Sequence, residues 1–344
     1  MTFRMKSAVL AAAAAAFFLS GCGEKPAEKT AGAEKAAAPA AEKATEVAPV
    51  IIYSNADEEA QQAMRNALDA NGFKGKYLMQ GFGTSELGGK LVAEGTSIEA
   101  DVVTISTYYL ESLQKQKNMF AKLETGFETL NPIPDYYAPI LGNCGALFVN
   151  TEVLKADGLA KPSSIADLAK PEYAGHISVP DIMGSSTSWL MTQAAIADKG
   201  EVDGAAEIRA IEKNAGVHLE KSGSAPLKKI RAGEVAVGFG LRHQAVADKA
   251  KGLPIDYVDP TEGNFTLFEA AAVVNKGEKT NPNAQKVVET IVKFGRTELL
   301  KYYPVAIYKG ETVDAADKPA NPKQFSEPLT VELLQKHQKL VKGE

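Results

Sequence analysis

The chain has 344 residues, of which 45% are hydrophobic and 24% are charged, and its formal net charge is −5 at pH 7. This length allows two domains of ordinary size with a substantial core, and the acidic balance argues against nucleic acid as a partner. Cys22 and Cys144 are the only cysteines, so the sequence has no disulfide framework and no thiolate metal cluster.

The amino-terminal segment has the pattern of an export signal followed by a tether. Arg4 and Lys6 precede an apolar run too short to span a bilayer, and the run ends in Leu-Ser-Gly-Cys, which resembles the processing signal of bacterial lipoproteins. We expect 1–21 to be removed as a lipoprotein signal peptide and Cys22 to be acylated. Residues 22–48 are rich in Ala, Glu, Lys and Pro, which predicts a disordered tether. The expected location is the periplasmic or cell-surface side of a bacterial membrane, with the lipid as the only membrane contact.

After the tether, apolar runs of strand length alternate with segments of helical period, which predicts an α/β architecture with largely parallel sheets. In the first part we expect strands at 48–54, 76–82 and 100–106 and helices at 57–72, 84–95 and 107–120. In the later part we expect helices at 187–200, 204–216 and 225–234 and strands at 218–223 and 235–241.

Two apolar segments can carry the chain between two lobes. The stretch 136–154 contains two apolar runs that lead toward a second lobe, and the run that starts at 267 resembles a strand that returns. The resulting expectation is a lobe one made of 49–150 and 269–344 and a lobe two made of 151–268.

Five short polar loops connect a predicted strand to a predicted helix. They lie at 54–56, 83–85, 106–107, 184–188 and 222–226. Each places hydroxyls and backbone amides at a helix N-terminus, where the amides lack partners and the helix dipole favours an anion. Ser, Thr and Asn are also the preferred N-cap residues, so a single loop of this kind is explained by helix capping and does not indicate a ligand site. Five of them at the carboxyl ends of strands predict a shared ligand site in a cleft.

Three stretches resemble the extracellular solute-binding proteins of ABC importers. They are ILGNCGALFVN at 140–150, SVPDIMGSSTSW at 178–189 and the long stretch from KSGSAPLKK to TEGNF at 221–265. More narrowly, the chain is similar to the branch that includes 2-aminoethylphosphonate, hexose-phosphate and ferric-ion binding proteins. The resemblance implies a type 2 periplasmic-binding-protein fold, with two lobes of mixed, mostly parallel sheets joined by a two-strand hinge. It also implies a monomer without a cofactor that delivers a small molecule to an ABC permease.

Candidate contacts come from this resemblance and from the residues themselves. Arg242 can offer a bidentate fork to an oxyanion, His243 can donate to the same oxygen, and Glu262 can pair with a ligand ammonium. Gln244 follows His243 where the phosphate-sugar binders have Asp, which argues against recognition of sugar hydroxyls. The resemblance implies further contacts from Ser54, Asn55, Thr84, Ser85, Ser106, Thr107, Ser185, Ser186, Thr187, Ser222, Ser224 and Ala225.

These features predict a binding protein that is not an enzyme, because hydroxyls and amides supply many neutral donors and few titratable groups. The expected ligand is a small oxyanion, such as a phosphonate like 2-aminoethylphosphonate or a phosphorylated solute. Ferric ion is an alternative, although 240–246 lacks the tyrosines that such a site would need. A carboxylate or polyamine ligand on the same fold stays open. A phosphoester hydrolase with Ser222 or Ser186 as nucleophile and His243 as base is a further alternative.

Overall fold

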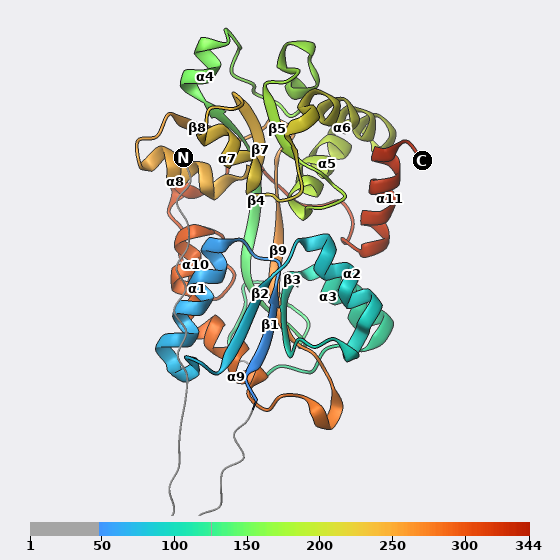
Figure 1. Cartoon of the computed structure of the whole chain (residues 1–344), viewed down its shortest axis with the longest axis vertical. Coiled ribbons are helices and arrows are strands. Elements are labelled where there is room, and N and C mark those ends of the chain that lie inside the picture. The colour runs from blue at the N-terminus through green and yellow to red at the C-terminus, as the bar shows by residue number, and fades with distance from the viewer. Residues whose placement is uncertain (1–47, 125) are drawn as a thin grey trace, which may run out of the picture. The chain divides into compact units, whose positions relative to one another are not determined.

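The computed structural model describes residues 48–124 and 126–344 (Figure 1). The signal peptide, the acylated Cys22 and the tether up to residue 47, all expected from the sequence, lie outside these residues. In the described part of the chain, no helix is both long enough and apolar enough to cross a bilayer.

The first strands and helices alternate as the sequence predicts. They are β1 (Val50–Ser54), α1 (Glu58–Leu68), β2 (Tyr77–Gly81), α2 (Thr84–Glu94), β3 (Val102–Ser106) and α3 (Thr107–Lys117). β1 lies between β2 and β3 and pairs with both in parallel, so the carboxyl ends of all three strands lie at one edge. Two later helices, α9 (Ala284–Thr290) and α10 (Arg296–Tyr302), pack against α1. We call this group the β1 lobe.

A second group of strands and helices forms the β7 lobe. Its elements are α4 (Thr151–Ala156), β5 (Ile177–Pro180), α5 (Ser186–Lys199), α6 (Glu201–Ala215), β6 (Leu219–Glu220), α7 (Ala225–Arg231), β7 (Val237–Leu241), α8 (Arg242–Ala250) and β8 (Ile255–Val258). β5 pairs in parallel with β6 and β7. Here too the carboxyl ends of the parallel strands lead into helices.

Two long antiparallel strands run through both lobes (Figure 1). β4 (Ala138–Asn150) pairs with β7 and β8 at one end and with β9 (Asn264–Val273) at the other, and β9 continues the sheet to β3. The two apolar runs seen in the sequence at 136–154 are therefore one strand, and all of its residues are buried. Parallel pairs within each lobe and antiparallel pairs at the crossing give the mixed sheet and two-strand hinge that were expected.

The carboxy-terminal helix α11 (Val331–Lys342) contacts helices of both lobes. It packs against α6 and also touches α3. Trp189 Nε1 on α5 donates to His337 Nδ1 on α11 at 2.9 Å, and Gln116 Nε2 on α3 donates to Glu332 Oε1 at 2.8 Å. α11 is therefore a third structural link between the lobes besides β4 and β9.

Candidate ligand-binding site

A polar cavity of about 190 Å³ lies between the lobes, next to the hinge strands. The β1 lobe lines it with the loop 55–57 after β1 and with Thr84. The β7 lobe lines it with the loops 184–187 and 221–224, and the hinge strands contribute Asn143 and Glu269. Strand-to-helix loops from both lobes thus meet at one site, because the carboxyl ends of the parallel strands in each lobe face the cavity.

Two long helices begin at the cavity, one in each lobe. α2 starts at Thr84, and α5 starts at Ser186 after its N-cap Ser185, whose hydroxyl accepts from the Thr187 amide at 3.2 Å. Amides in the first turn of a helix lack intrahelical partners, and the helix dipole adds partial positive charge there. The two helix starts can therefore donate to the oxygens of an anion from opposite sides.

The lobes touch across this site. Thr84 Oγ1 lies 3.4 Å from Ser186 Oγ, and Thr84 Oγ1 also accepts from Asn55 Nδ2 at 3.0 Å. Within the β7 lobe, the loop 221–224 packs so closely on α5 that a Cβ atom at Gly223 would lie 2.0 Å from Thr187 Oγ1. The polar loops thus touch both between the lobes and within the β7 lobe, around the edge of the cavity.

The floor of the cavity is acidic. Glu269 Oε1 on β9 accepts from Asn55 Nδ2 at 3.2 Å and from Asn143 Nδ2 at 3.0 Å. Asp57 Oδ1 caps α1 by accepting from the Ala60 amide, and it also accepts from the Tyr303 hydroxyl. These contacts leave the second oxygen of each carboxyl group without a partner among the described residues.

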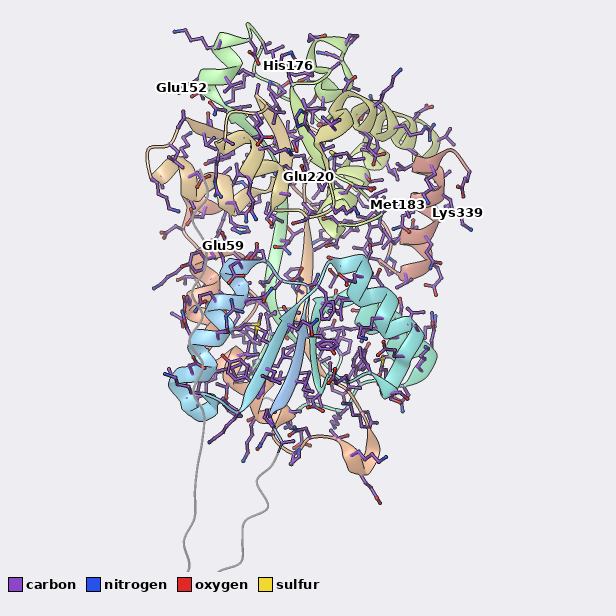
Figure 2. The ribbon with its side chains drawn as sticks, in the orientation of Figure 1. Glu59, Glu152, His176, Met183, Glu220 and Lys339 are labelled. Atoms are coloured by element: carbon purple, nitrogen blue, oxygen red, sulfur yellow. The ribbon has the colours of Figure 1, made fainter. Side chains whose placement is uncertain are left out.

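Burial disfavours the charged forms of both carboxyl groups. Loss of hydration raises the pKa of Asp57 to about 6. Burial, and next the negative charge of Asp57, raise the pKa of Glu269 to about 8. Glu59, in the first turn of α1, lies on the side of the β1 lobe that faces the β7 lobe and adds further negative charge near Asp57 (Figure 2).

The structure brings about half of the predicted site residues to the cavity. Those that line it are Asn55, Thr84, Ser185, Ser186, Thr187, Ser222 and Ser224. Their role in ligand binding remains a prediction.

Five of the predicted polar-loop residues do not line this cavity. Ser54 is buried, and its Oγ accepts from Thr104 Oγ1 at 2.6 Å, while Ser106 is buried at the end of β3. Ser85 and Ala225 donate their amides to nearby carbonyls, those of Gly184 and Ser222. Thr107 lines a separate groove beside Glu111. These residues lie in the predicted loops but do not belong to the cavity lining, because neighbouring positions in a loop face different sides.

Arg242 does not have the ligand-binding role that the sequence suggested. Its guanidinium forms a bidentate pair with Asp259, with nitrogen-to-oxygen distances of 2.7 and 3.1 Å. It also donates to the carbonyls of Asp317 and Lys318. The side chain is buried and its donors already have protein partners, so it joins segments of the fold rather than facing the cavity.

Glu262 also has a structural role. Its two carboxylate oxygens accept from the amides of Ile165 and Ala166 at 3.0 Å each, at the start of the 3₁₀-helix Ala166–Ala169. The buried carboxylate caps that helix, so it is not placed to meet a ligand ammonium in this cavity.

His243 lies behind the cavity wall. Its ring packs on Tyr303 with a centroid distance of 4.2 Å, and its Nε2 lies 3.9 Å from Asp57 Oδ2. Burial lowers the pKa of His243 to about 3, so the ring is neutral at physiological pH. In the described part of the chain it forms no hydrogen bond with Ser186 or Ser222, so the nucleophile and base of a hydrolase are not in contact.

The sequence reasoning missed the acidic floor, which consists of Asp57, Asn143, Glu269 and Tyr303. Asp57 was interpreted only as part of the first turn of a helix. It does cap α1, but it also lines the cavity. The sequence did contain an indication of these residues, because Asn143 and Glu269 are polar residues inside the otherwise apolar strands β4 and β9. Burying a polar side chain is costly unless it has a partner, so a polar residue in such a strand indicates a candidate site.

Two further observations concern metal ligands and the thiol. Within residues 48–124 and 126–344, no group of three or more His, Cys, Asp or Glu side chains is placed to hold a metal ion. Cys144 is buried in β4, and burial raises the pKa of its thiol to about 11, as expected for a packing residue rather than a nucleophile.

Two lobes that close on a polar cavity beside a two-strand hinge define a solute-binding protein of the type 2 class. Residues 98–323 match the family described as bacterial extracellular solute-binding protein, and the chain belongs to this family.

Curated relatives share this similarity over part of their length. The spermidine/putrescine-binding periplasmic protein of Escherichia coli (strain K12) is 25% identical over 211 residues, which are 56% of this chain and 58% of the relative. The Fe(3+)-binding periplasmic protein of Serratia marcescens is 28% identical over 181 residues, which are 51% of this chain and 52% of that protein. The chain thus spans about half the length of the curated relatives that it matches.

Solved structures share the whole described fold at low sequence identity. A periplasmic thiamin binding protein superimposes with a TM-score of 0.70 at 17% identity, covering 86% of this chain and 95% of its own. The periplasmic binding protein AfuA from Actinobacillus pleuropneumoniae, with fructose-6-phosphate bound, gives a TM-score of 0.65 at 19% identity, covering 86% and 97%. At these identities the likeness shows the fold alone.

Proposed function

We propose that the chain is a lipid-anchored substrate-binding protein of an ABC transporter that captures a small oxyanion by closure of its two lobes. The ligand class is a phosphonate, such as 2-aminoethylphosphonate, or a small phosphorylated solute. The observation that carries the proposal is the meeting of the α2 and α5 starts at one cavity, with Thr84 Oγ1 and Ser186 Oγ 3.4 Å apart.

The donors around the cavity suit the oxygens of a tetrahedral anion. Hydroxyls of Thr84, Ser186 and Ser222 line the cavity and can act as neutral donors. The first-turn amides of α2 and α5 can add to them, except those of Ser85 and Thr187, which already have protein partners. Lys221 adds a positive charge at the exposed rim. Because the donors come from both lobes, an anion between them favours the closed form over the open form.

The names of similar proteins do not select the ligand class. AfuA, which shares the fold, is described with fructose-6-phosphate bound, whereas the two curated relatives are named for binding spermidine and putrescine or ferric ion. The cavity of about 190 Å³ favours a compact solute over a large one.

The test is a ligand screen with the secreted form of the chain, without 1–21 and with Cys22→Ser to prevent acylation. Thermal shift followed by calorimetry would compare 2-aminoethylphosphonate, phosphate, sugar phosphates, dicarboxylates, putrescine and ferric citrate. A ligand at a hundred times its Kd stabilises the folded state by about 2.7 kcal/mol, which is visible in Tm. Stabilisation by putrescine or ferric citrate, with none by any phosphonate or phosphate, would overturn the proposal.

A chromogenic phosphate ester separates binding from catalysis. The binding proposal expects no steady turnover, because His243 is not in contact with a serine hydroxyl. Turnover that is lost in Ser222→Ala or Ser186→Ala would instead establish the hydrolase alternative.

A further inference from the structure

We infer that Asp57 and Glu269 form a cation subsite at the floor of the cavity, so that the captured solute carries an ammonium group in addition to its oxyanion. The ammonium takes the place of a proton that this pair holds in the empty protein, and capture therefore releases a proton. The inference rests on the proposed function and names the substrate class of that same site.

The first argument is the set of oxygens that lack donors. Asn55 Oδ1, Asp57 Oδ2, Asn143 Oδ1 and Glu269 Oε2 are buried without a hydrogen-bond partner among the described residues, and all four residues line the cavity. Glu269 is 3% exposed and Asn143 is 9% exposed. Buried polar atoms without partners are rare in native proteins, so this group requires an explanation. All four atoms are acceptors when the carboxyl groups are ionised, and an ammonium group supplies three donors and a positive charge.

The second argument is the absence of a compensating protein cation in the described ranges. Glu269 forms no ion pair there, and the basic group nearest to Asp57 is the neutral His243, 3.9 Å away. Among residues 48–124 and 126–344, Lys221 is the only Lys or Arg that lines the cavity, and it lies at the exposed rim. Two buried carboxyl groups without a cation cannot both stay ionised, because each charge would be desolvated and would repel the other.

The other groups that face the pair do not supply the missing charge. From α1, Glu58 and Glu59 add negative charge near Asp57. Tyr303, which follows α10, donates its hydroxyl to Asp57 and stays protonated because burial holds its pKa well above the usual value. Tyr108 on α3 also stays protonated, because burial, and to a lesser extent the nearby Tyr109 and Glu269, hold the pKa of its hydroxyl well above the usual value. Among the described residues, these groups near the pair are therefore neutral or negative, and Lys221 adds its charge only at the exposed rim.

The release of a proton on ligand binding follows from the pKa values of these two carboxyl groups. Because burial raises the pKa of Asp57 to about 6 and that of Glu269 to about 8, the two carboxyl groups together hold about one proton at pH 7 without ligand. An ammonium beside the pair favours ionisation of Glu269, which then loses its proton to solvent. By linkage, the association constant rises by at most tenfold per pH unit between about pH 6 and pH 8.

The two ends of the cavity define the solute. Helix starts and hydroxyls suit an oxyanion, and the carboxyl pair suits an ammonium. A phosphonate without an amine leaves the acceptor oxygens without donors, and a diamine without an anion leaves the helix amides without acceptors. Each loss costs affinity because the unpaired protein groups remain buried.

The experiment compares 2-aminoethylphosphonate with ethylphosphonate, which has the same skeleton without the amine, and with putrescine. Calorimetry at pH 7 in two buffers of different ionisation enthalpy counts the protons released. We expect 2-aminoethylphosphonate to bind at least about 50-fold more tightly than ethylphosphonate, and to release close to one proton, in accord with a buried charge-assisted hydrogen-bond pair.

Matched variants assign the effect to the carboxyl pair. Glu269→Gln keeps the size and an acceptor oxygen, and it is expected to reduce the preference for the amine to less than about fivefold and to abolish most of the proton release. Asp57→Asn keeps a good N-cap for α1 and is expected to weaken the amine preference as well. Glu59→Gln removes a nearby charge that does not line the cavity, and is expected to change affinity by less than about threefold. Ionisation of the ligand phosphonate is common to all variants, so it cancels in the difference between them.

The outcomes separate this inference from the proposed function. Equal affinity for 2-aminoethylphosphonate and ethylphosphonate, with no proton release that depends on Glu269, overturns the cation subsite and leaves the oxyanion receptor intact. Binding of putrescine without any phosphonate or phosphate supports the subsite and overturns the oxyanion receptor.

If none of the three ligands binds, the protonation of the Asp57–Glu269 pair can be tested by a stability measurement without ligand. The folded protein holds a proton on Glu269 that the unfolded chain loses above about pH 4.5, so this group makes the folded state less stable as the pH rises from about 4.5 to about 8. Urea unfolding of wild type should show this loss, and Glu269→Gln should lack it. Parallel profiles for the two proteins would overturn the inference.

Discussion

Thr84 and Ser186 stand at the starts of two helices in different lobes, and their hydroxyl oxygens lie 3.4 Å apart. Thr84 Oγ1 also accepts from Asn55 Nδ2, whose side chain reaches Glu269 on the hinge strand. A chain of polar contacts therefore links the lobe contact, the β1 loop and the hinge.

Thr84→Val should weaken ligand capture with little effect on folding. The variant keeps the shape of the side chain and removes the hydroxyl that contacts Asn55 and Ser186, which costs about 1 to 2 kcal/mol in the closed form. We expect a five- to thirtyfold rise in Kd, measured by calorimetry with the tightest ligand of the screen. Thr107→Val is the matched control, because Thr107 begins α3 but lies outside this cavity. An equal effect of both variants would contradict the assigned role.

Arg242→Met should destabilise the fold without changing recognition. Removing the guanidinium leaves Asp259 buried without its bidentate partner, and loss of one member of such a pair costs about 3 to 5 kcal/mol. Urea unfolding should show the loss, and Asp259→Asn in the same chain should recover part of it. The Kd of the folded variant should stay within about threefold of wild type. A large loss of affinity with unchanged stability would restore Arg242 as a ligand-binding residue.

Gly223→Ala should disrupt the loop that packs on α5. The new methyl group would lie 2.0 Å from Thr187 Oγ1, so the loop or the first turn of α5 must move. We expect at least a tenfold rise in Kd, because both segments line the cavity. Gly89→Ala in α2 meets nothing within 4 Å and should stabilise the protein by about 0.5 to 1 kcal/mol. Normal affinity of Gly223→Ala would show that the loop adapts without cost to the site.

The contact between Trp189 and His337 should make the docking of α11 depend on pH. Trp189 Nε1 donates to His337 Nδ1, so the ring must be neutral at that nitrogen, and burial lowers the pKa of His337. As the pH falls below about 6.5, His337 becomes protonated more readily in the unfolded chain than in the folded protein. The free energy of unfolding therefore decreases as the pH falls below this value.

Trp189 is the only tryptophan, so its fluorescence reports this contact directly. Between pH 7 and pH 5, His337→Gln should lose less stability and show a smaller fluorescence change than wild type. His176→Gln, at a histidine that pairs with Asp157 on the surface, serves as the control and should follow wild type. Identical behaviour of all three proteins would exclude a role for His337 in the pH response.

Much of the fold could be predicted because its elements are encoded locally. The alternation of short apolar runs and helical periods predicted β1 to β3 and α1 to α3 within a few residues. β4 was harder, since its all-buried pattern lacks the alternation of a one-sided strand and was interpreted as two runs. α11 was not predicted at all, although its buried residues Leu333, Leu334, His337 and Val341 follow a helical period.

The candidate site could be predicted only in part. Polar residues after strands indicated which loops would meet, but not which side chains in each loop would face the cavity. Ser54 and Asn55 are neighbours in one loop, yet Ser54 bonds inside the sheet and Asn55 reaches Glu269. The difference depends on the register of β1 against β3, which pairs Ser54 with Thr104.

By itself the sequence determined the α/β alternation, the polar loops at helix starts and the apolar strands that cross between lobes, because periodicity and capping depend on residues close together in the chain. Only the tertiary structure decided that Arg242 pairs with Asp259, that Glu262 caps a distant 3₁₀-helix, and that Asp57 and Glu269 line the same cavity. These pairings join residues far apart in the chain, and in a buried site the choice of partner sets the charge and the hydrogen bonds that remain for a ligand.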